Sequence, residues 1–366
     1  MMLMGSAGDL IIVFLSLELL SIPLYVLAGI DHKRDASREA SLKYFLLGTM
    51  ASAFVLFGIA FVYGAAGTTS LYGITEAVSQ GKVQQFLLIC GSALLLAGFG
   101  FKVAAVPFHS WTPDVYHGSP SSVTAFMSVG AKAAGFAALI RVFSLNFTAI
   151  AIELTPLFWV LSALTMIVGN VVAVAQTNLK RMLAYSSIAH AGYILMAFVG
   201  FGDAAVRQNS IASALFYLAA YALTSLGAWS VLVAVEQQDG SGNEISDLAG
   251  LGKTAPSLAA AMVVFMLSFT GIPLTLGFWG KFYLFRTAIE GGFTYLAVAG
   301  LLTSLVSAFY YLRVVVKMYF QPGEALAHKG RLTSLIATIL AILVVGLAFV
   351  PGYLFNLAAA GLIAGA

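Results

Sequence analysis

The sequence is poor in charged residues. Only 9% of its 366 residues are Asp, Glu, Lys or Arg, whereas soluble domains carry about 25%. By contrast, 60% of the residues are hydrophobic, and the mean hydropathy is +0.96. This composition excludes an ordinary soluble domain. It predicts an all-α, polytopic membrane protein folded as one transmembrane helix bundle over residues 1–366.

Motifs that hold cofactors are also missing. Cys90 is the only cysteine, so the chain alone cannot form a disulfide, an iron–sulfur cluster or a Cys-x-x-Cys site. It has no glycine-rich nucleotide loop and no serine or cysteine nucleophile motif. No His, Cys, Asp or Glu cluster has the spacing of metal ligands. We therefore expect no cofactor and no metal in this chain, and any redox reaction that it serves takes place elsewhere.

Nucleic-acid and targeting signals are missing too. The net charge is only +3, and no basic run is interleaved with aromatic residues, so we expect no binding to nucleic acid. The N-terminus has neither a basic region nor a cleavage site. We therefore do not expect a removable signal peptide.

Apolar runs of about 20 residues predict membrane-spanning helices. We expect ten spans, at residues 8–29, 41–64, 83–106, 120–143, 154–176, 182–200, 210–235, 256–286, 293–318 and 332–356. Proline or glycine interrupts the region after Val106 and the run 256–286, so we expect broken helices there. A break at membrane depth is tolerated only where it faces protein or a water-filled cavity. Two broken spans in different halves also point to an inverted repeat.

Basic residues in the connections predict the orientation. One side has eleven of them: Lys33, Arg34, Arg38, Lys43, Lys180, Arg181, Lys253, Arg313, Lys317, Lys329 and Arg331. The other side has four: Lys82, Arg141, Arg207 and Arg286. We expect the first side in the cytoplasm and both chain termini outside. The longest polar connection, 236–255, is expected to be a surface linker with little structure.

Three lysines lie inside apolar sequence. Lys102 comes shortly before two prolines, Lys132 has glycine and alanine around it, and Lys281 follows Gly271 and Pro273. An ionisable residue inside a membrane is a functional candidate by default, because moving a charge from water into hydrocarbon costs on the order of several kcal/mol. Two alternatives stay open. Backbone carbonyls could simply hold Lys132 between helices, and Lys281 could snorkel to the surface from a helix end.

Glu18 lies near the middle of the first expected span and has the opposite charge. Desolvation makes a buried lysine lose its proton more easily, and a nearby carboxylate opposes this effect. A Glu–Lys pair whose separation changes can therefore act as a proton switch. The alternative is a static buried salt bridge that fixes the register of two helices.

Histidines are candidates for relaying protons, since imidazole titrates near neutral pH. His109 follows a proline in the first broken region, and His190 lies beside serines and a tyrosine that could hold water. The alternative for both is a buried ring satisfied by one hydroxyl or carbonyl. His117 lies nearer a loop, and Asp114 is expected at a membrane boundary, as a cap or as a partner for a basic side chain.

Five segments resemble one known family. They are LELLSIPLYVLAG, LKYFLLGTMASAFVLFG, GFGFKVAAVPFHSWTPDVYHGSP, KRMLAYSSIAHAGY and GIPLTLGFWGKFYLF, and they follow in the family's order from Leu17 to Phe285. The chain is similar to the antiporter-like subunits of the proton-translocating NADH–quinone oxidoreductase (respiratory complex I). The wording of SPSSVTAFMSVGAKAAGFAALIRV resembles subunit N of that complex more closely than its paralogues L and M.

The resemblance implies a role for most candidate residues. Glu18 would pair with Lys102, and Lys132 would connect the two halves of a hydrated central path. Lys281 would lie near the outward half-channel, and His109 would follow the first break. We expect His190 on the same path because of its polar neighbours.

Fold, partners and location are implied in the same way. Residues 1–145 would be the remainder of a first repeat, 146–320 the second repeat, and 321–366 a C-terminal helix. About four N-terminal helices of the family would be missing, so a fragment or a mis-assigned start is expected. NADH, FMN, iron–sulfur clusters and quinone would be bound by partner subunits. The neighbours would be the antiporter-like subunit M and small membrane subunits such as K, in the plasma (inner) membrane of a bacterium.

Two other functions fit the same residues. A subunit of a multi-subunit sodium/proton antiporter would share the fold and the lysines, and it would exchange sodium for protons without NADH. A structural membrane scaffold would use the lysines only to hold helices together. In that case Lys132→Ala would impair assembly but leave pumping per assembled complex intact.

Overall fold

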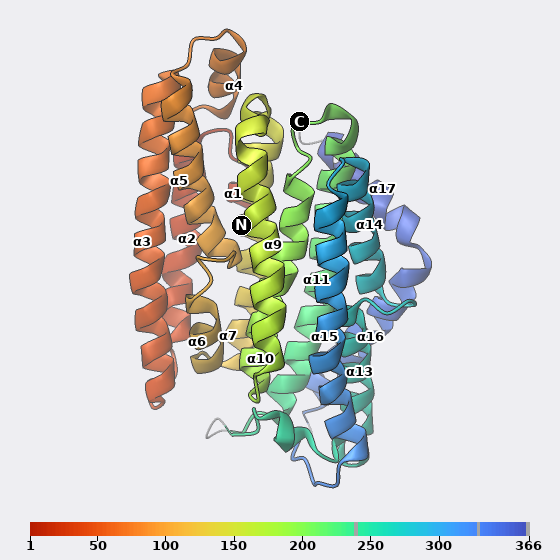
Figure 1. The fold of residues 1–366 in the computed structure, drawn as a ribbon. Helices are drawn as coiled ribbons and strands as arrows, with labels where there is room; N and C mark the ends of the chain where they lie inside the picture. The colour runs from red at the N-terminus through yellow and green to blue at the C-terminus, as the bar shows by residue number, and fades with distance from the viewer. Residues whose placement is uncertain (238–240, 328–329, 364–366) are drawn as a thin grey trace.

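The computed structural model describes residues 1–237, 241–327 and 330–363. Within these ranges every regular element is a helix and none is a strand (Figure 1), so the all-α prediction is confirmed. The helices are α1 (Met2–Ser6), α2 (Leu10–Ala28), α3 (Asp35–Ala66), α4 (Leu71–Ser79), α5 (Gln85–Val103), α6 (Trp111–Gly118), α7 (Ser121–Phe126), α8 (Lys132–Leu139), α9 (Ala151–Val174), α10 (Leu179–Leu195), α11 (Ala204–Val235), α12 (Leu251–Thr254), α13 (Pro256–Thr270), α14 (Leu276–Glu290), α15 (Thr294–Phe320), α16 (Arg331–Gly346) and α17 (Pro351–Ile363).

The bundle is built from helices of membrane-spanning length. In the described ranges, eight helical stretches are long and apolar enough to cross a membrane. One of them, Ser121–Ser144, joins α7 and α8 through the π-helical turn Met127–Ala131. The other two expected spans correspond to α10, which has 17 residues, and to the interrupted pair α13 and α14. Length and composition therefore do not confirm the expected count of ten.

The C-terminal part departs from expectation. The apolar helix there ends at Phe349, and Pro351 begins the separate helix α17. Proline disfavours helical backbone in the residue before it, yet it fits the first turn of a new helix. The expected single span 332–356 is thus two helices, α16 and α17, which both pack against α11.

Both expected helix breaks are present. After α5 the chain turns at Ala104, with φ +63°, before α6 begins at Trp111. After α13 it turns at Gly271, with φ +86°, and at Leu274, with φ +73°, before α14 begins. The polar backbone at the first break is satisfied by side chains, because Thr165 accepts from the amide of Val106 at 2.9 Å. The two broken helices run in opposite directions across the bundle (Figure 1).

The two ends of the bundle differ in charge. The α2–α3 and α9–α10 connections and residues 241–255 lie together at the lower end in Figure 1, which we call the basic end. Lys329 lies outside the described residues.

Residues 241–255 are more ordered than expected, since they contain a 3-10 turn, Ile245–Leu248, and α12. The expectation of a linker with little structure is therefore wrong for this part.

Small residues allow the closest helix contacts. A Cβ added to Gly58 of α3 would lie 2.9 Å from the carbonyl oxygen of Gly91 in α5. In the same way, a Cβ on Gly169 of α9 would lie 2.5 Å from the backbone nitrogen of Ala189 in α10. Such close approach drives helix association in lipid, where the hydrophobic effect does not. These contacts fix α5 and α10, the helices that carry Lys102 and His190.

Candidate functional site

Three lysine side chains point into the interior of the bundle. The exposed fractions are 4% for Lys102, 2% for Lys132 and 4% for Lys281. They come from the last turn of α5, the start of α8 and the middle of α14. The burial of Lys281 excludes the alternative in which it snorkels to the surface. Each ammonium group needs polar partners, since an unpaired buried charge is strongly destabilising.

Hydroxyl groups hold Lys102. Its Nζ donates to Ser21 Oγ at 2.8 Å and to the Tyr44 hydroxyl at 3.3 Å. The Tyr44 ring stacks on Trp111 of α6, with 4.6 Å between the ring centroids. The first helix break thus positions the amine, because residues on both sides of the break take part.

Glu18 lies close to Lys102 but does not touch it. The half-buried Glu18 accepts a hydrogen bond from Ser52 of α3. It precedes Ser21, which holds Lys102, by three residues on α2, and such residues are neighbours on a helix face. Among the described residues no ion pair joins Glu18 to Lys102. The expected pair is therefore open here, which argues against a static salt bridge.

Lys132 is bound to α10. Its Nζ donates to both the carbonyl oxygen and the Oγ of Ser187, at 2.5 Å each. The Tyr221 hydroxyl of α11 donates to the same Oγ at 2.9 Å. Backbone carbonyls alone therefore do not hold Lys132, because its second acceptor is the Ser187 hydroxyl, to which Tyr221 also donates.

The stem of Lys102 packs against α8, the helix that begins at Lys132. A Cβ added to Gly135 would lie 3.3 Å from Cγ of Lys102. Gly135 follows Lys132 by three residues on α8, so the stem of Lys102 lies about one helical turn from Lys132. Only glycine leaves room for this approach.

His190 lies among tyrosines. Its Nδ1 is 2.6 Å from the Tyr217 hydroxyl, and its Nε2 is 3.1 Å from the Tyr311 hydroxyl. Tyr311 also shares a hydrogen bond with Ser186. Beside the ring is a cavity of about 10 Å³, at the lower limit for one water molecule. Sequence reasoning gave these tyrosines no role, because an aromatic residue in an apolar run is usually packing surface.

Lys281 is bound to the end of α13. Its Nζ donates to the carbonyl oxygens of Phe269 and Thr270, at 2.9 Å each, and to Ser304 Oγ at 2.7 Å. These carbonyls are left free by the second helix break, and a helix C-terminus favours a cation. The ring of Phe269 also packs against His190, with 5.1 Å between the centroids. One residue therefore contacts both His190 and Lys281.

The buried lysines thus form a series. The stem of Lys102 packs on α8 one helical turn from Lys132, Lys132 donates to Ser187, and Ser187 lies one turn from His190 on α10. The ring of Phe269 packs on His190, and its carbonyl oxygen accepts from Lys281. We call Lys102, Lys132, Ser187, His190 and Lys281 the lysine axis. Hydroxyl groups accompany it at every lysine, and a hydroxyl can both accept and donate a proton.

His109 does not join the axis. It lies half-buried in the first break, and its buried Nδ1 has no hydrogen-bond partner. His117 instead lies 3.2 Å from Asn178 Oδ1, near the basic end. Asp114 pairs with Lys43 at 2.7 Å and with Arg181 at 2.9 Å. The structure thus brings four sequence-derived candidates together, counting Lys102, Lys132, His190 and Lys281, with Glu18 beside them and His109 apart.

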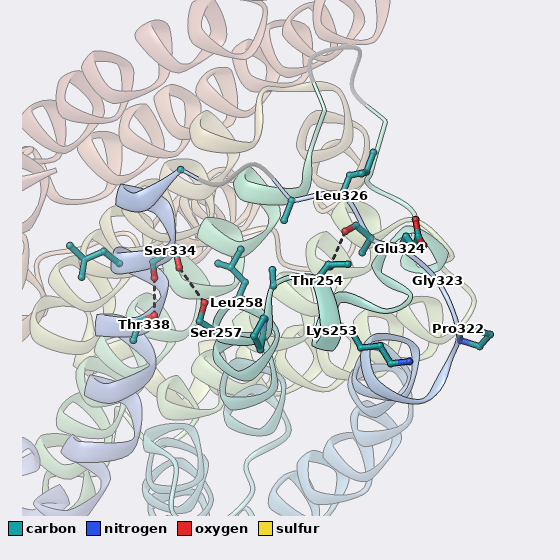
Figure 2. A pocket seen from close by; sticks show the side chains of 16 residues that line it. Lys253, Thr254, Ser257, Leu258, Pro322, Gly323, Glu324, Leu326, Ser334 and Thr338 are labelled. Carbon is teal, nitrogen blue, oxygen red and sulfur yellow. Dashed lines mark hydrogen bonds between the residues drawn. The ribbon is translucent and has the colours of Figure 1, made fainter.

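One large cavity lies away from the axis. It has a volume of about 1260 Å³ and lies between α13, α16 and residues 322–327 at the basic end, where Lys253, Ser257 and Ser334 line it (Figure 2). No axis residue borders it. In the part of the chain that the structure describes, no three His, Cys, Asp or Glu side chains are grouped to hold a metal ion.

Comparison with known proteins identifies the family. Residues 7–307 match the family model described as "NADH:quinone oxidoreductase/Mrp antiporter, TM". The chain is 48% identical, over 96% of its length, to the NADH-quinone oxidoreductase subunit N of Trichlorobacter lovleyi, of which it covers 71%. Across eight relatives with this subunit name, the chain spans 59% to 74% of their length.

Solved structures agree. A chain of respiratory complex I from Thermus thermophilus, solved with bound aureothin, superposes with a TM-score of 0.83 at 38% identity, covering 97% of this chain and 76% of that one. A chain of the Mrp complex from Dietzia gives a TM-score of 0.85 at 22% identity, covering 96% and 73%. The second likeness shows the fold alone. The resemblance found in the sequence is therefore confirmed, and it is closer to subunit N than to the Mrp type.

Proposed function

The chain belongs to the NADH:quinone oxidoreductase/Mrp antiporter transmembrane family, and on that premise we propose that it is a proton-translocating membrane subunit of an NADH–quinone oxidoreductase. The relatives that carry the name subunit N support this proposal. Protons move along the lysine axis through water and side chains, and quinone reduction elsewhere in the complex drives them. This chain holds no redox centre, and other subunits bind NADH, FMN, the iron–sulfur clusters and quinone.

Each axis residue has a role in this proposal. Protons enter from the cytoplasm and reach Lys102, whose affinity for a proton depends on the distance to Glu18. Lys132 passes them to the second half through Ser187 and His190. Lys281 releases them toward the outer side. His109 relays protons within the first break.

One observation carries the proposal: the buried lysines are joined in series. Ser187 contacts Lys132 and precedes His190 by three residues on α10, and Phe269 contacts both His190 and Lys281. A scaffold needs its lysines to be held, but it does not need them to be connected. A charge buried in a membrane protein is costly, so a connected set indicates transport.

The surroundings follow from the same proposal. The basic end faces the cytoplasm of a bacterium, and both termini lie on the outer side of its plasma membrane. Residues 1–145 and 146–320 are inverted repeats, followed by the C-terminal part 321–366. The neighbours are the antiporter-like subunit M and small membrane subunits such as K.

Replacing Lys102 tests the proposal. Lys102→Ala removes the ammonium group beside Glu18, so NADH-driven proton pumping should fall to less than about a tenth, as expected for loss of a proton-transfer group. The measurement is acidification of inverted membrane vesicles, divided by the rate of NADH oxidation.

Lys253→Ala is the matched control, because Lys253 is exposed at the basic end and lies off the axis. It should pump normally. Full pumping by Lys102→Ala, with assembled complex present, would refute the proposal.

A further inference from the structure

A fourth lysine is buried, and the proposed route does not use it. Lys180 lies in the first turn of α10 at the basic end, with an exposed fraction of 0%. Its Nζ donates to Glu236 Oε1 at 3.1 Å and to the carbonyl oxygen of Ser119 at 2.8 Å. Arg34 lies 3.5 Å from the same carboxylate oxygen. Unlike the axis lysines, Lys180 thus has a carboxylate partner.

This cluster ties four segments together. Arg34 comes from the α2–α3 connection, Ser119 from the turn between α6 and α7, Lys180 from α10, and Glu236 from the end of α11. We call these four residues the clamp. Two of its members precede residue 146 and two follow it, so the clamp joins the two halves of the chain at the basic end.

The carboxylate of the clamp is charged at neutral pH. Burial raises the pKa of Glu236, but Lys180 and the neighbouring hydrogen-bond donors outweigh this effect, so the pKa lies below its ordinary value. Removing one partner of such a buried pair leaves an uncompensated charge, whereas replacing both by apolar side chains is often tolerated.

A line of polar side chains starts directly behind the clamp. Ser121, Thr124, Ser128 and Lys132 follow one another at intervals of three or four residues, which places them on one face of the helix 121–144. All four are buried, with exposed fractions of at most 2%. We call Ser121, Thr124 and Ser128 the hydroxyl ladder. It leads from the basic end to Lys132.

The ladder is connected to the axis by hydrogen bonds. Ser128 Oγ lies 3.0 Å from Ser225 Oγ of α11. Ser225 is one helical turn from Tyr221, which donates to Ser187 Oγ, the acceptor of Lys132. The π-helical turn Met127–Ala131 contains Ser128 and directly precedes Lys132, and such turns occur frequently at functional sites.

A buried hydroxyl of the clamp lacks a partner among the described residues. Ser119 has an exposed fraction of 0%, and no described residue forms a hydrogen bond with its hydroxyl oxygen. Buried polar groups without a protein partner are usually satisfied by ordered water. The region between the clamp and the ladder is therefore suited to hold water.

From these observations we infer that the hydroxyl ladder is a hydrated proton uptake path that reaches Lys132 directly from the basic end, and that the clamp is its gate. This inference rests on the proposed function and adds a second uptake route beside the one at Lys102. While Lys180 and Glu236 are paired, the path is closed to bulk water. When they separate, water connects the basic end to Lys132.

The single native cysteine makes the path testable by thiol accessibility. In a Cys90→Ala background, Ser121→Cys or Ser128→Cys places one thiol on the ladder of the assembled complex. Silver ion, a small cation that reacts with thiolates in water, is applied to the basic-end face of inverted vesicles without NADH. The thiols left unreacted are then labelled with a fluorescent maleimide after denaturation and read on this chain alone.

Opening the clamp should expose the ladder. Glu236→Gln, and separately the double variant Lys180→Met with Glu236→Met, should each raise the rate of silver reaction at both positions at least about tenfold. Glu39→Gln is the matched control, since it removes a carboxylate from an exposed ion pair with Lys43 at the same end. It should leave the rates unchanged.

Two results would overturn the inference. One is equal reaction rates with the clamp intact and opened. The other is a thiol at Ser128 that stays as slow as one from Ser162→Cys, a buried hydroxyl position on α9 away from the ladder. The double variant guards against misfolding, because it leaves neither a buried lysine nor a buried carboxylate without its partner, and Arg34, which loses Glu236, is 23% exposed. The assay needs no pumping, so its failure and failure of the Lys102→Ala test are distinct.

Discussion

At the scale of residues, the partners of each buried lysine separate transport from structure. Lys102 donates to two hydroxyls, Lys132 to one hydroxyl and one carbonyl, and Lys281 to one hydroxyl and two carbonyls. Among the described residues none of the three forms an ion pair. A hydroxyl partner can accept and donate a proton, whereas a directly paired carboxylate stabilises the charged form of the lysine, as in the pair of Lys180 with Glu236.

Removing one hydroxyl that contacts the lysine axis should weaken proton transfer without unfolding the protein. Tyr311→Phe deletes the hydroxyl that lies between Ser186 and His190. A lost hydrogen bond costs about 1 kcal/mol, so assembly should survive. Pumping per NADH oxidised should fall several-fold in inverted vesicles.

The neighbouring tyrosine provides the control. Tyr310 is equally buried, and its hydroxyl donates to Asn170 at 2.9 Å, whereas of the two tyrosines only Tyr311 bonds to His190 among the described residues. Tyr310→Phe should cost a similar amount of stability and leave pumping unchanged. Equal pumping by the two variants would show that the hydroxyl of Tyr311 carries no protons.

Residue type and context predicted the burial of the three axis lysines but not the burial of Lys180. Lys102, Lys132 and Lys281 stand out because apolar residues surround them on both sides. Lys180 follows polar residues and was assigned to a loop, and its complete burial comes from contacts with distant segments. Tertiary structure alone brings Ser119 and Glu236 to it.

At the scale of elements, the helix breaks place the lysines. The end of α13 offers free carbonyls to Lys281, and Gly271 turns the chain away directly after them. Glycine and proline in the sequence predicted this break. They did not predict the left-handed conformation of Ala104 and Leu274, because non-glycine residues rarely adopt it and only packing maintains it.

A methyl group at the second break should affect pumping. Gly271 has φ +86°, and an added Cβ would lie 2.9 Å from Cδ of Lys281. Gly271→Ala should therefore displace the lysine and reduce NADH-driven pumping, in addition to a backbone cost of about 1 kcal/mol.

Gly292→Ala separates these two effects. Gly292 has φ +84°, yet nothing lies within 4 Å of its added Cβ. It should lower thermal stability by a similar amount and leave pumping intact, as measured by melting of the purified complex and by vesicle acidification. If both variants pump equally, Gly271 does not position Lys281.

At the scale of the whole molecule, two groups of helices meet along the axis. In Figure 1, α2, α3, α5 and α6 of the first half lie on one side, and α11, α13, α14, α15 and α16 of the second half lie on the other. Lys132, Ser187 and the clamp all lie where the halves meet. We therefore expect motion between the halves to change the contacts that control proton transfer.

Composition predicted the bundle, but it did not fix the number of spans. α10 is 17 residues long and is almost entirely buried by other helices, so it does not need the length of a lipid-facing span. The split between α16 and α17 falls at Pro351, and a search for long apolar runs does not detect a single proline within one. Apolar composition also did not predict the order of the elements, which came from the resemblance to the family.

The central claim is that Lys132 hands protons between the two halves, and its replacement tests this most directly. The measurement is NADH-driven proton pumping per assembled complex in inverted vesicles carrying Lys132→Ala. The account predicts a complex that assembles and oxidises NADH but loses most of its pumping. Reduced assembly with normal pumping per assembled complex would contradict it, and would show that Lys132 only holds helices together.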